Sequence, residues 1–198
     1  MTLTLTTHFV PRSSRRSAII AREIALVTGF TLLTAALAQV RIPLGFTPVP
    51  VTGQTLAVLL AGASLGAWRG ASSQLLYWLL GMVGLPFYSN ATSGWSVATG
   101  PTMGYLVGFI VAAAVVGRLA EHHQDRKVLS SIAAMTFGSV IIYAFGATWL
   151  AIDLGIPLAT GETNAIALGV APFLVGDVIK MCLAGAATAS TWRFINRE

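Results

Sequence analysis

Long apolar segments, separated by short charged or proline-rich stretches, dominate this chain. Apolar residues make up 55% of the 198 positions and charged residues only 10%, whereas about a quarter of the residues in soluble domains are charged. A helix needs about 20 residues to cross the hydrocarbon core of a bilayer, and its backbone satisfies its own hydrogen bonds there. The chain is therefore predicted to be an all-α integral membrane protein in a lipid bilayer.

The apolar segments predict six transmembrane helices joined by ordered outer loops. The predicted helices cover residues 23–40, 53–68, 71–84, 100–117, 128–154 and 165–192. Three prolines between positions 41 and 52 cannot continue a regular helix, so this segment is predicted to be an outer loop. The other two predicted outer loops are 85–99 and 155–164. The expected organisation is a basic tail, a membrane domain and a short C-terminal end, over 1–22, 23–193 and 194–198.

Lysine and arginine residues gather on one side of this predicted topology. Ten of the twelve flank helix ends that would face the cytoplasm: Arg12, Arg15, Arg16, Arg22, Arg69, Arg118, Arg126, Lys127, Arg193 and Arg197. Because cytoplasmic loops carry such an excess, both termini are predicted to be cytoplasmic. The scatter of the basic residues also argues against a nucleic-acid partner, since the net charge of +5 forms no basic stripe.

Asp177 and Lys180 lie within an apolar run near the C-terminus. Residues three apart share one face of a helix, so both side chains are predicted to point into the interior of the bundle. Ionisable residues at membrane depth usually mark a ligand or ion pathway. The alternative is a structural ion pair that locks two helices together, because pairing lowers the desolvation penalty of each charge.

Small residues recur every four positions in three segments. The sets are Gly62, Gly66 and Gly70; Gly100, Gly104 and Gly108; and Ala21, Ala25 and Gly29. Each predicts a smooth helix face that a neighbouring helix can approach closely. For the set on the first helix, that neighbour lies either within the bundle, which is the default, or in another subunit.

The sequence gives little support for a catalytic site or a cofactor-binding site. Ser64 fits the nucleophile-elbow pattern, but that motif needs a strand before it, and Ser64 lies within an apolar span. The three histidines, His8, His122 and His123, lie in polar flanks and offer Ser64 no catalytic base. Adjacent side chains such as His122 and His123 diverge on a helix, and a solvated charged loop explains them. We predict no enzyme activity, no metal and no other cofactor, and any energy input must come from elsewhere because no phosphate-binding loop is present.

Three separated motifs resemble the BioY family, the biotin-specific substrate-binding (S) components of energy-coupling factor (ECF) transporters. They are VPVTGQTL at 49–56, GLPFY at 84–88 followed by GPTMGYLVG at 100–108, and PFLVGDVIK at 172–180. The resemblance implies a six-helix S component that takes up biotin with high affinity across a prokaryotic cytoplasmic membrane. It also implies an external pocket closed by outer loops.

The resemblance further implies that partner proteins supply the energy. These would be a transmembrane coupling subunit and a pair of ABC-type ATPases. The small residues Ala21, Ala25 and Gly29 would form the docking surface on the first helix. Two alternatives are an S component or small transporter for another vitamin and, with less support, an intramembrane enzyme.

Biotin carries a ureido group with two N–H donors and one carbonyl acceptor, and a valerate tail that ends in a carboxylate. Asp177 can accept a hydrogen bond from a ureido N–H, and Asn90 can both donate and accept. Lys180 can pair with the carboxylate or hold Asp177 ionised, and both roles remain open.

Five further residues are secondary candidates for the pocket. Thr52, Gln54 and Tyr143 offer polar groups, while Tyr88 and Trp95 could wall the ring system from water. For Tyr143, a core tyrosine bonded to a backbone carbonyl is an equally good interpretation.

Overall fold

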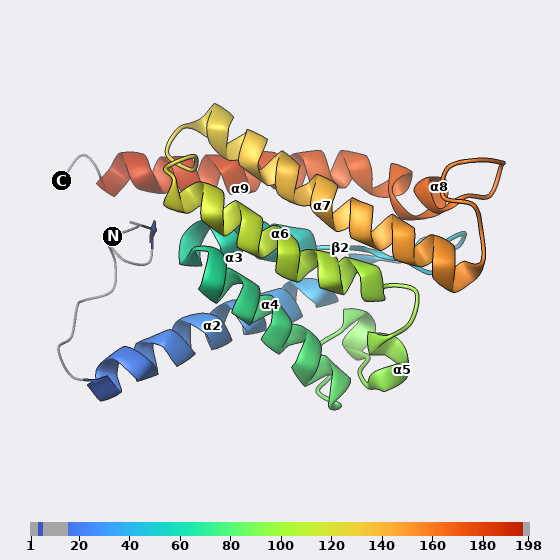
Figure 1. The fold of residues 1–198 in the computed structure, drawn as a ribbon, viewed down its shortest axis with the longest axis horizontal. Coiled ribbons are helices and arrows are strands. Elements are labelled where there is room, and N and C mark those ends of the chain that lie inside the picture. Colours follow the sequence, from blue (N-terminus) through green and yellow to red (C-terminus); the bar gives the residue numbers. More distant parts are fainter. Residues whose placement is uncertain (1–3, 6–15, 196–198) are drawn as a thin grey trace.

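The computed structural model describes residues 4, 5 and 16–195, and its regular elements are almost all helical (Figure 1). The longer helices are α2 (Arg16–Gln39), α3 (Gln54–Leu65), α4 (Ala67–Met82), α6 (Met103–Glu121), α7 (Val128–Leu154) and α9 (Leu174–Ile195). The shorter elements are α5 (Trp95–Ala98), α8 (Ala165–Gly169), the 3-10 turns η1 (Ser89–Ala91) and η2 (Ala171–Phe173), and the strands β1 (Arg41–Ile42) and β2 (Val51–Thr52).

Helix α6 lies at the centre of the bundle, where it packs against α3, α4 and α7. Helix α9 packs on α3 and α7, and α2 lies at the opposite edge against α3 and α4. The hairpin β1–β2, α5 and α8 gather towards the right-hand end in Figure 1, opposite the described ends Arg16 and Ile195. This end of the bundle therefore carries the connections that were predicted as outer loops.

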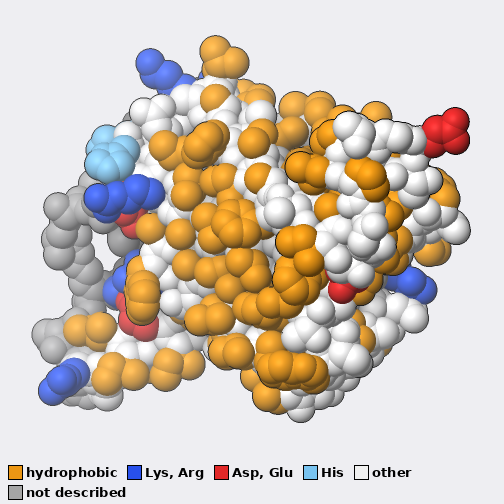
Figure 2. Space-filling model, turned by 45° about the vertical axis from the view of Figure 1, so that its right-hand side comes forward, with side chains coloured by type: hydrophobic (Ala, Val, Ile, Leu, Met, Phe, Trp, Pro, Cys, Tyr) orange, Lys and Arg blue, Asp and Glu red, His pale blue; other side chains and the backbone are white. Residues whose placement is uncertain are grey.

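In the described part of the chain, four stretches are long and apolar enough to cross a membrane: Arg16–Gln39, Met103–Glu121, Val128–Leu154 and Ala165–Ile195. Helices α3 and α4, with 12 and 16 residues, are only about 18 and 24 Å long. Within the described residues, four of the six predicted spans therefore reach full membrane-spanning length, and α3 and α4 do not. Figure 2 shows hydrophobic side chains over much of the middle of one face, with Lys, Arg and His side chains mainly towards its left-hand edge.

The first helix begins earlier than predicted. Helix α2 starts at Arg16, seven positions before the predicted start at residue 23, and so takes in part of the predicted tail. Arg16 and Arg22 lie on its first turns, because a helix with a mainly apolar sequence tolerates charged residues at its end. Arg12, Arg15 and Arg197 lie outside the described residues.

The turn between the second and third predicted spans lies at Gly66, not at residues 69 and 70. Gly66 has φ 85° and ψ 178°, a conformation that strongly favours glycine. A Cβ atom on Gly117 of α6 would lie 2.4 Å from the backbone nitrogen of Ala67, so this break packs directly on α6. Gly62, Gly66 and Gly70 therefore do not form one helix face, which corrects that prediction.

In the second glycine set, Gly100 precedes α6, and Gly104 and Gly108 pack against Phe145 and Ile142 of α7.

The sixth predicted span is also interrupted, since α8 and η2 precede α9. Pro172 lies in the 3-10 turn between them. Proline lacks an N–H group and restricts the residue before it, which accounts for this break.

The loop between α6 and α7 is exposed at His122 and His123, as predicted, but buries Asp125. Asp125 is only 2% exposed, and its Oδ2 accepts a 2.5 Å hydrogen bond from Nε1 of Trp192. The guanidinium of Arg126 lies 4.5 Å from the centre of the Trp192 ring. Burial raises the pKa of the Asp125 carboxyl above its usual value. Among residues 4, 5 and 16–195, no three potential ligands gather as a metal site.

Candidate binding site

A cavity of about 530 Å³ opens between the hairpin, the segment from α4 to α6, and helices α6, α7 and α9. Its volume is typical of a small-molecule site. Seven of the eight predicted pocket residues line it: Thr52, Gln54, Tyr88, Asn90, Tyr143, Asp177 and Lys180. Trp95 does not, because α5 leaves its side chain 69% exposed outside the lining.

Asp177 and Lys180 form a salt bridge of 2.6 Å between Oδ1 and Nζ. The Asp177 side chain is 4% exposed and that of Lys180 16%. Oδ1 of Asp177 also accepts from the Thr55 hydroxyl at 3.1 Å, and Oδ2 accepts from the Tyr143 hydroxyl at 2.5 Å. The carboxylate is therefore held by three protein donors, and Tyr143 bonds to it and not to a backbone carbonyl.

The break before α9 places Asp177 at a helix N-terminus. Helix α9 starts at Leu174, so Asp177 lies in its first turn. The N-terminal end of a helix stabilises negative charge, because its first N–H groups have no partner within the helix. An interrupted helix at membrane depth is tolerated where it lines a cavity.

A second chain of hydrogen bonds crosses from α3 to α4. Thr52 donates to Oε1 of Gln54 at 2.8 Å, and Nε2 of Gln54 donates to the hydroxyl of Tyr77 at 2.7 Å. Tyr77 in turn donates to the carbonyl of Phe87 at 3.2 Å. These contacts orient the Gln54 amide in the cavity wall, where it is only 8% exposed.

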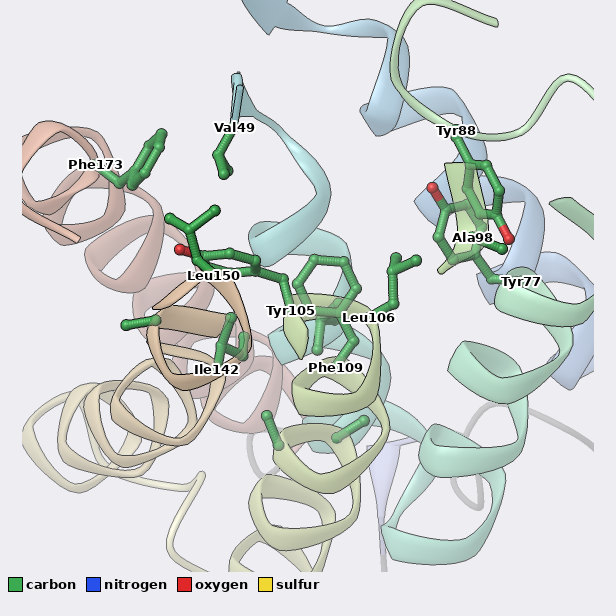
Figure 3. Close-up of a cluster of buried hydrophobic side chains, with 14 of the residues drawn as sticks. Val49, Tyr77, Tyr88, Ala98, Tyr105, Leu106, Phe109, Ile142, Leu150 and Phe173 are labelled. Atoms are coloured by element: carbon green, nitrogen blue, oxygen red, sulfur yellow. The ribbon is translucent and has the colours of Figure 1, made fainter. Parts of the chain in front are cut away.

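The remaining wall is apolar and aromatic. In Figure 3, Val49 and Phe173 lie on one side, Tyr77 and Tyr88 on the other, and Leu106 on α6 between them. The rings of Tyr77 and Tyr88 pack edge to face with their centres 5.8 Å apart. Tyr88 donates to the carbonyl of Trp78 at 2.6 Å, and burial raises its pKa to about 12. The phenol is thus neutral at physiological pH and serves as a rigid wall.

Asn90 reaches the cavity from a strained turn. Both Asn90 (φ 65°) and Ala91 (φ 54°) adopt the left-handed conformation, which is costly for alanine and persists only where the surroundings impose it. Gln39, the last residue of α2, holds the turn in this conformation through hydrogen bonds of both its amide oxygen and its amide nitrogen. Its Oε1 accepts from the N–H of Ala91 at 2.9 Å, and its Nε2 donates to the carbonyl of Tyr88 at 3.1 Å.

Gln39→Leu is therefore expected to release the turn that presents Asn90, while α2 itself remains folded. Backbone amides of residues 88–92 should exchange hydrogen faster in the variant than in the wild type, as measured by mass spectrometry. Leu32→Gln on the same helix, at a side chain that is 51% exposed, is the matched control. Unchanged exchange in Gln39→Leu would contradict this role.

The sequence prediction missed much of the lining, including the polar residues Arg41, Thr55 and Tyr77. Thr55 lies within the motif at 49–56, so its place in the first turn of α3 was a usable signal. The position of Arg41 depends on hairpin pairing, which the sequence does not reveal.

The small residues on α2 lie away from the cavity. Ala21, Ala25 and Gly29 are all exposed, and a Cβ atom on Gly29 would meet nothing within 4 Å. The default expectation that this face packs inside the bundle is therefore wrong within the described part of the chain.

The sequence of this chain is similar to those of known proteins. The BioY family model matches residues 7–197. The biotin transporter BioY of Rhizobium etli is 42% identical over 171 residues, which cover 82% of this chain and 89% of the relative. That of Rhodobacter capsulatus is 38% identical over 184 residues, covering 87% and 95%.

A solved structure shares the fold. The S-component for biotin from an ECF-type ABC transporter superposes with a TM-score of 0.78 at 24% sequence identity, covering 94% of this chain and 96% of its own. The fold and the match over nearly the whole sequence agree, and the chain belongs to the BioY family.

Proposed function

We propose that this chain binds biotin in the cavity and serves as the S component of an ECF transporter for biotin uptake. The observation that carries the proposal is a cavity with mainly apolar walls into which Asp177, Lys180 and Tyr143 converge. Membership of the BioY family and relatives named as biotin transporters support the same ligand. The proposed role is binding and transport, not catalysis.

The proposed pose follows the chemistry of the ligand. The ureido N–H groups need a buried acceptor, which the Asp177 carboxylate provides, and Asn90 can pair with the ureido carbonyl or N–H. Thr52, Gln54 and Tyr143 complete the polar wall. The apolar fused rings would lie against Tyr88 and Leu106, which line the cavity.

Equilibrium binding to the purified protein tests this proposal. Biotin and desthiobiotin should both bind, since desthiobiotin keeps the ureido ring and lacks only the sulfur. Thiamine and riboflavin should not compete. Competition by either vitamin, with no binding of biotin, would identify an S component for a different substrate.

The chain is a multi-pass membrane protein, and the proposed topology has six spans with both termini in the cytoplasm. In a Cys182→Ala background, His122→Cys should be labelled only from the cytoplasmic side and Ser93→Cys only from outside. A membrane-impermeant maleimide applied to intact cells measures this. Labelling of position 122 from outside, with position 93 protected, would refute the orientation.

The proposed partners are a transmembrane coupling subunit and ABC-type ATPases, with docking on the exposed face of Ala21, Ala25 and Gly29. Ala25→Trp should block close approach of a partner helix and reduce biotin uptake, while binding to the purified protein stays unchanged. Ile24→Trp, at a side chain that is 61% exposed beside this face, is the control. Loss of binding in Ala25→Trp would exclude the docking role.

A further inference from the structure

The buried pair leaves no donor for a carboxylate. Nζ of Lys180 donates to the carbonyl of Thr52 at 2.6 Å, to the Thr55 hydroxyl at 3.2 Å and to Oδ1 of Asp177 at 2.6 Å. An ammonium group has three N–H donors, so all three already have protein acceptors. A ligand carboxylate placed here would also face the charge of Asp177 at close range, which disfavours two ionised groups together.

A second cation lines the cavity at its exposed side. Arg41 is the first residue of β1 and is paired with Thr52 of β2 in the antiparallel hairpin. Directly opposite residues of such a pair project their side chains from the same face, and the Thr52 side chain also lines the cavity. The Arg41 side chain therefore leaves the hairpin on the same face as that of Thr52, and both residues line the cavity.

Arg41 is exposed and has no other assignment. Within residues 4, 5 and 16–195, the structure shows no ion pair or side-chain hydrogen bond for its guanidinium, whereas Arg22, Arg69 and Arg118 each pair with a glutamate. The hairpin separates the backbone of Arg41 from that of Thr52, whose carbonyl anchors Lys180, by about one strand spacing, ~5 Å. The cavity thus has one neutralised charge pair in its wall and one uncompensated positive charge at its mouth.

We propose that Arg41 binds the carboxylate at the end of the ligand's aliphatic tail, while the Asp177–Lys180 pair serves the ring end. The inference rests on the proposed function and assigns Lys180 to holding Asp177 instead of contacting the tail. A guanidinium accepts a carboxylate through two parallel hydrogen bonds, a geometry that a neutral amide or ester cannot match. Arg41 would therefore make the site selective for the free acid over its neutral derivatives.

The test compares biotin with biotinamide, whose tail is uncharged, on purified protein by isothermal titration calorimetry. Arg41→Gln should weaken biotin binding about tenfold, a moderate loss because the side chain is exposed, and should leave biotinamide binding unchanged. Arg41→Lys should retain part of the preference for biotin, as a point charge without the fork geometry. Arg118→Gln makes the same change in net charge at an exposed side chain outside the cavity lining and should alter neither affinity.

Equal losses for biotin and biotinamide in Arg41→Gln would overturn the inference, because they would show that Arg41 acts on the hairpin and not on the carboxylate. No change for either ligand would overturn it as well. If the proposed function itself is wrong, the result differs, since the wild-type protein would then bind neither biotin nor desthiobiotin.

Discussion

Lys180→Met should abolish biotin binding and destabilise the protein, because it leaves the Asp177 carboxylate buried without its countercharge. Removal of one partner from a buried pair costs about 3–5 kcal/mol, whereas replacement of both by neutral groups is often neutral or stabilising. The double variant Asp177→Asn, Lys180→Met should therefore recover the thermal stability of the purified protein. It should recover binding at most to the weakened level of Asp177→Asn alone, since a neutral amide at position 177 presents no charge to the ureido group.

The single variant Asp177→Asn completes a double-mutant cycle with Lys180→Met and the double variant. It should weaken biotin binding by about 1.5–3 kcal/mol, the range for hydrogen bonds to charged groups. Melting temperatures and dissociation constants of the four proteins measure the coupling between the two side chains. If both single variants bind biotin as the wild type does, Asp177 and Lys180 form a structural lock and not a ligand site.

Gly117→Val should cause a comparable loss of stability through packing alone. The new Cβ atom would lie 2.4 Å from the backbone nitrogen of Ala67 and 2.4 Å from the carbonyl carbon of Gly66. Neither atom can move without displacing the break between α3 and α4, so the expected cost is about 3 kcal/mol or more, at the upper end for overpacking.

Thermal unfolding in detergent measures this loss. Gly29→Val, where a Cβ atom meets nothing within 4 Å, is the matched substitution on α2 and should change the melting temperature little. Equal melting temperatures for the two variants would show that α6 and the α3–α4 break are not closely packed.

Hydropathy predicted where helices occur but not where they end. The apolar residues continue across Gly66, so only the positive φ of that glycine reveals that α3 stops there. The start of α2 was predicted too late because the charged residues Arg16 and Arg22 were assigned to a polar tail, although they lie on the first turns of the helix. The interruption before α9 did have a signal, Pro172, which the prediction of one continuous span overlooked.

Some residues of the candidate site could be predicted from the sequence, and others could not. Asp177 and Lys180 were predictable, because charge in an apolar run has few explanations. Arg41 was not, since its place at the cavity depends on pairing across the hairpin. Trp95 was misplaced because the short helix α5 was predicted as loop, and a four-residue helix is too short for a periodicity from which the direction of a side chain can be predicted.

Gln39 and the exposed small residues belong to one rigid body, helix α2. From Ala25 to Gln39 the helix is about 21 Å long, so a change in its tilt at one end displaces the amide that holds Ala91 and Tyr88 at the other. If a partner that docks on α2 favours one tilt, it changes the affinity for biotin by some factor. Thermodynamic linkage then requires that biotin change the affinity for that partner by the same factor, so an empty and a loaded protein would compete unequally for it.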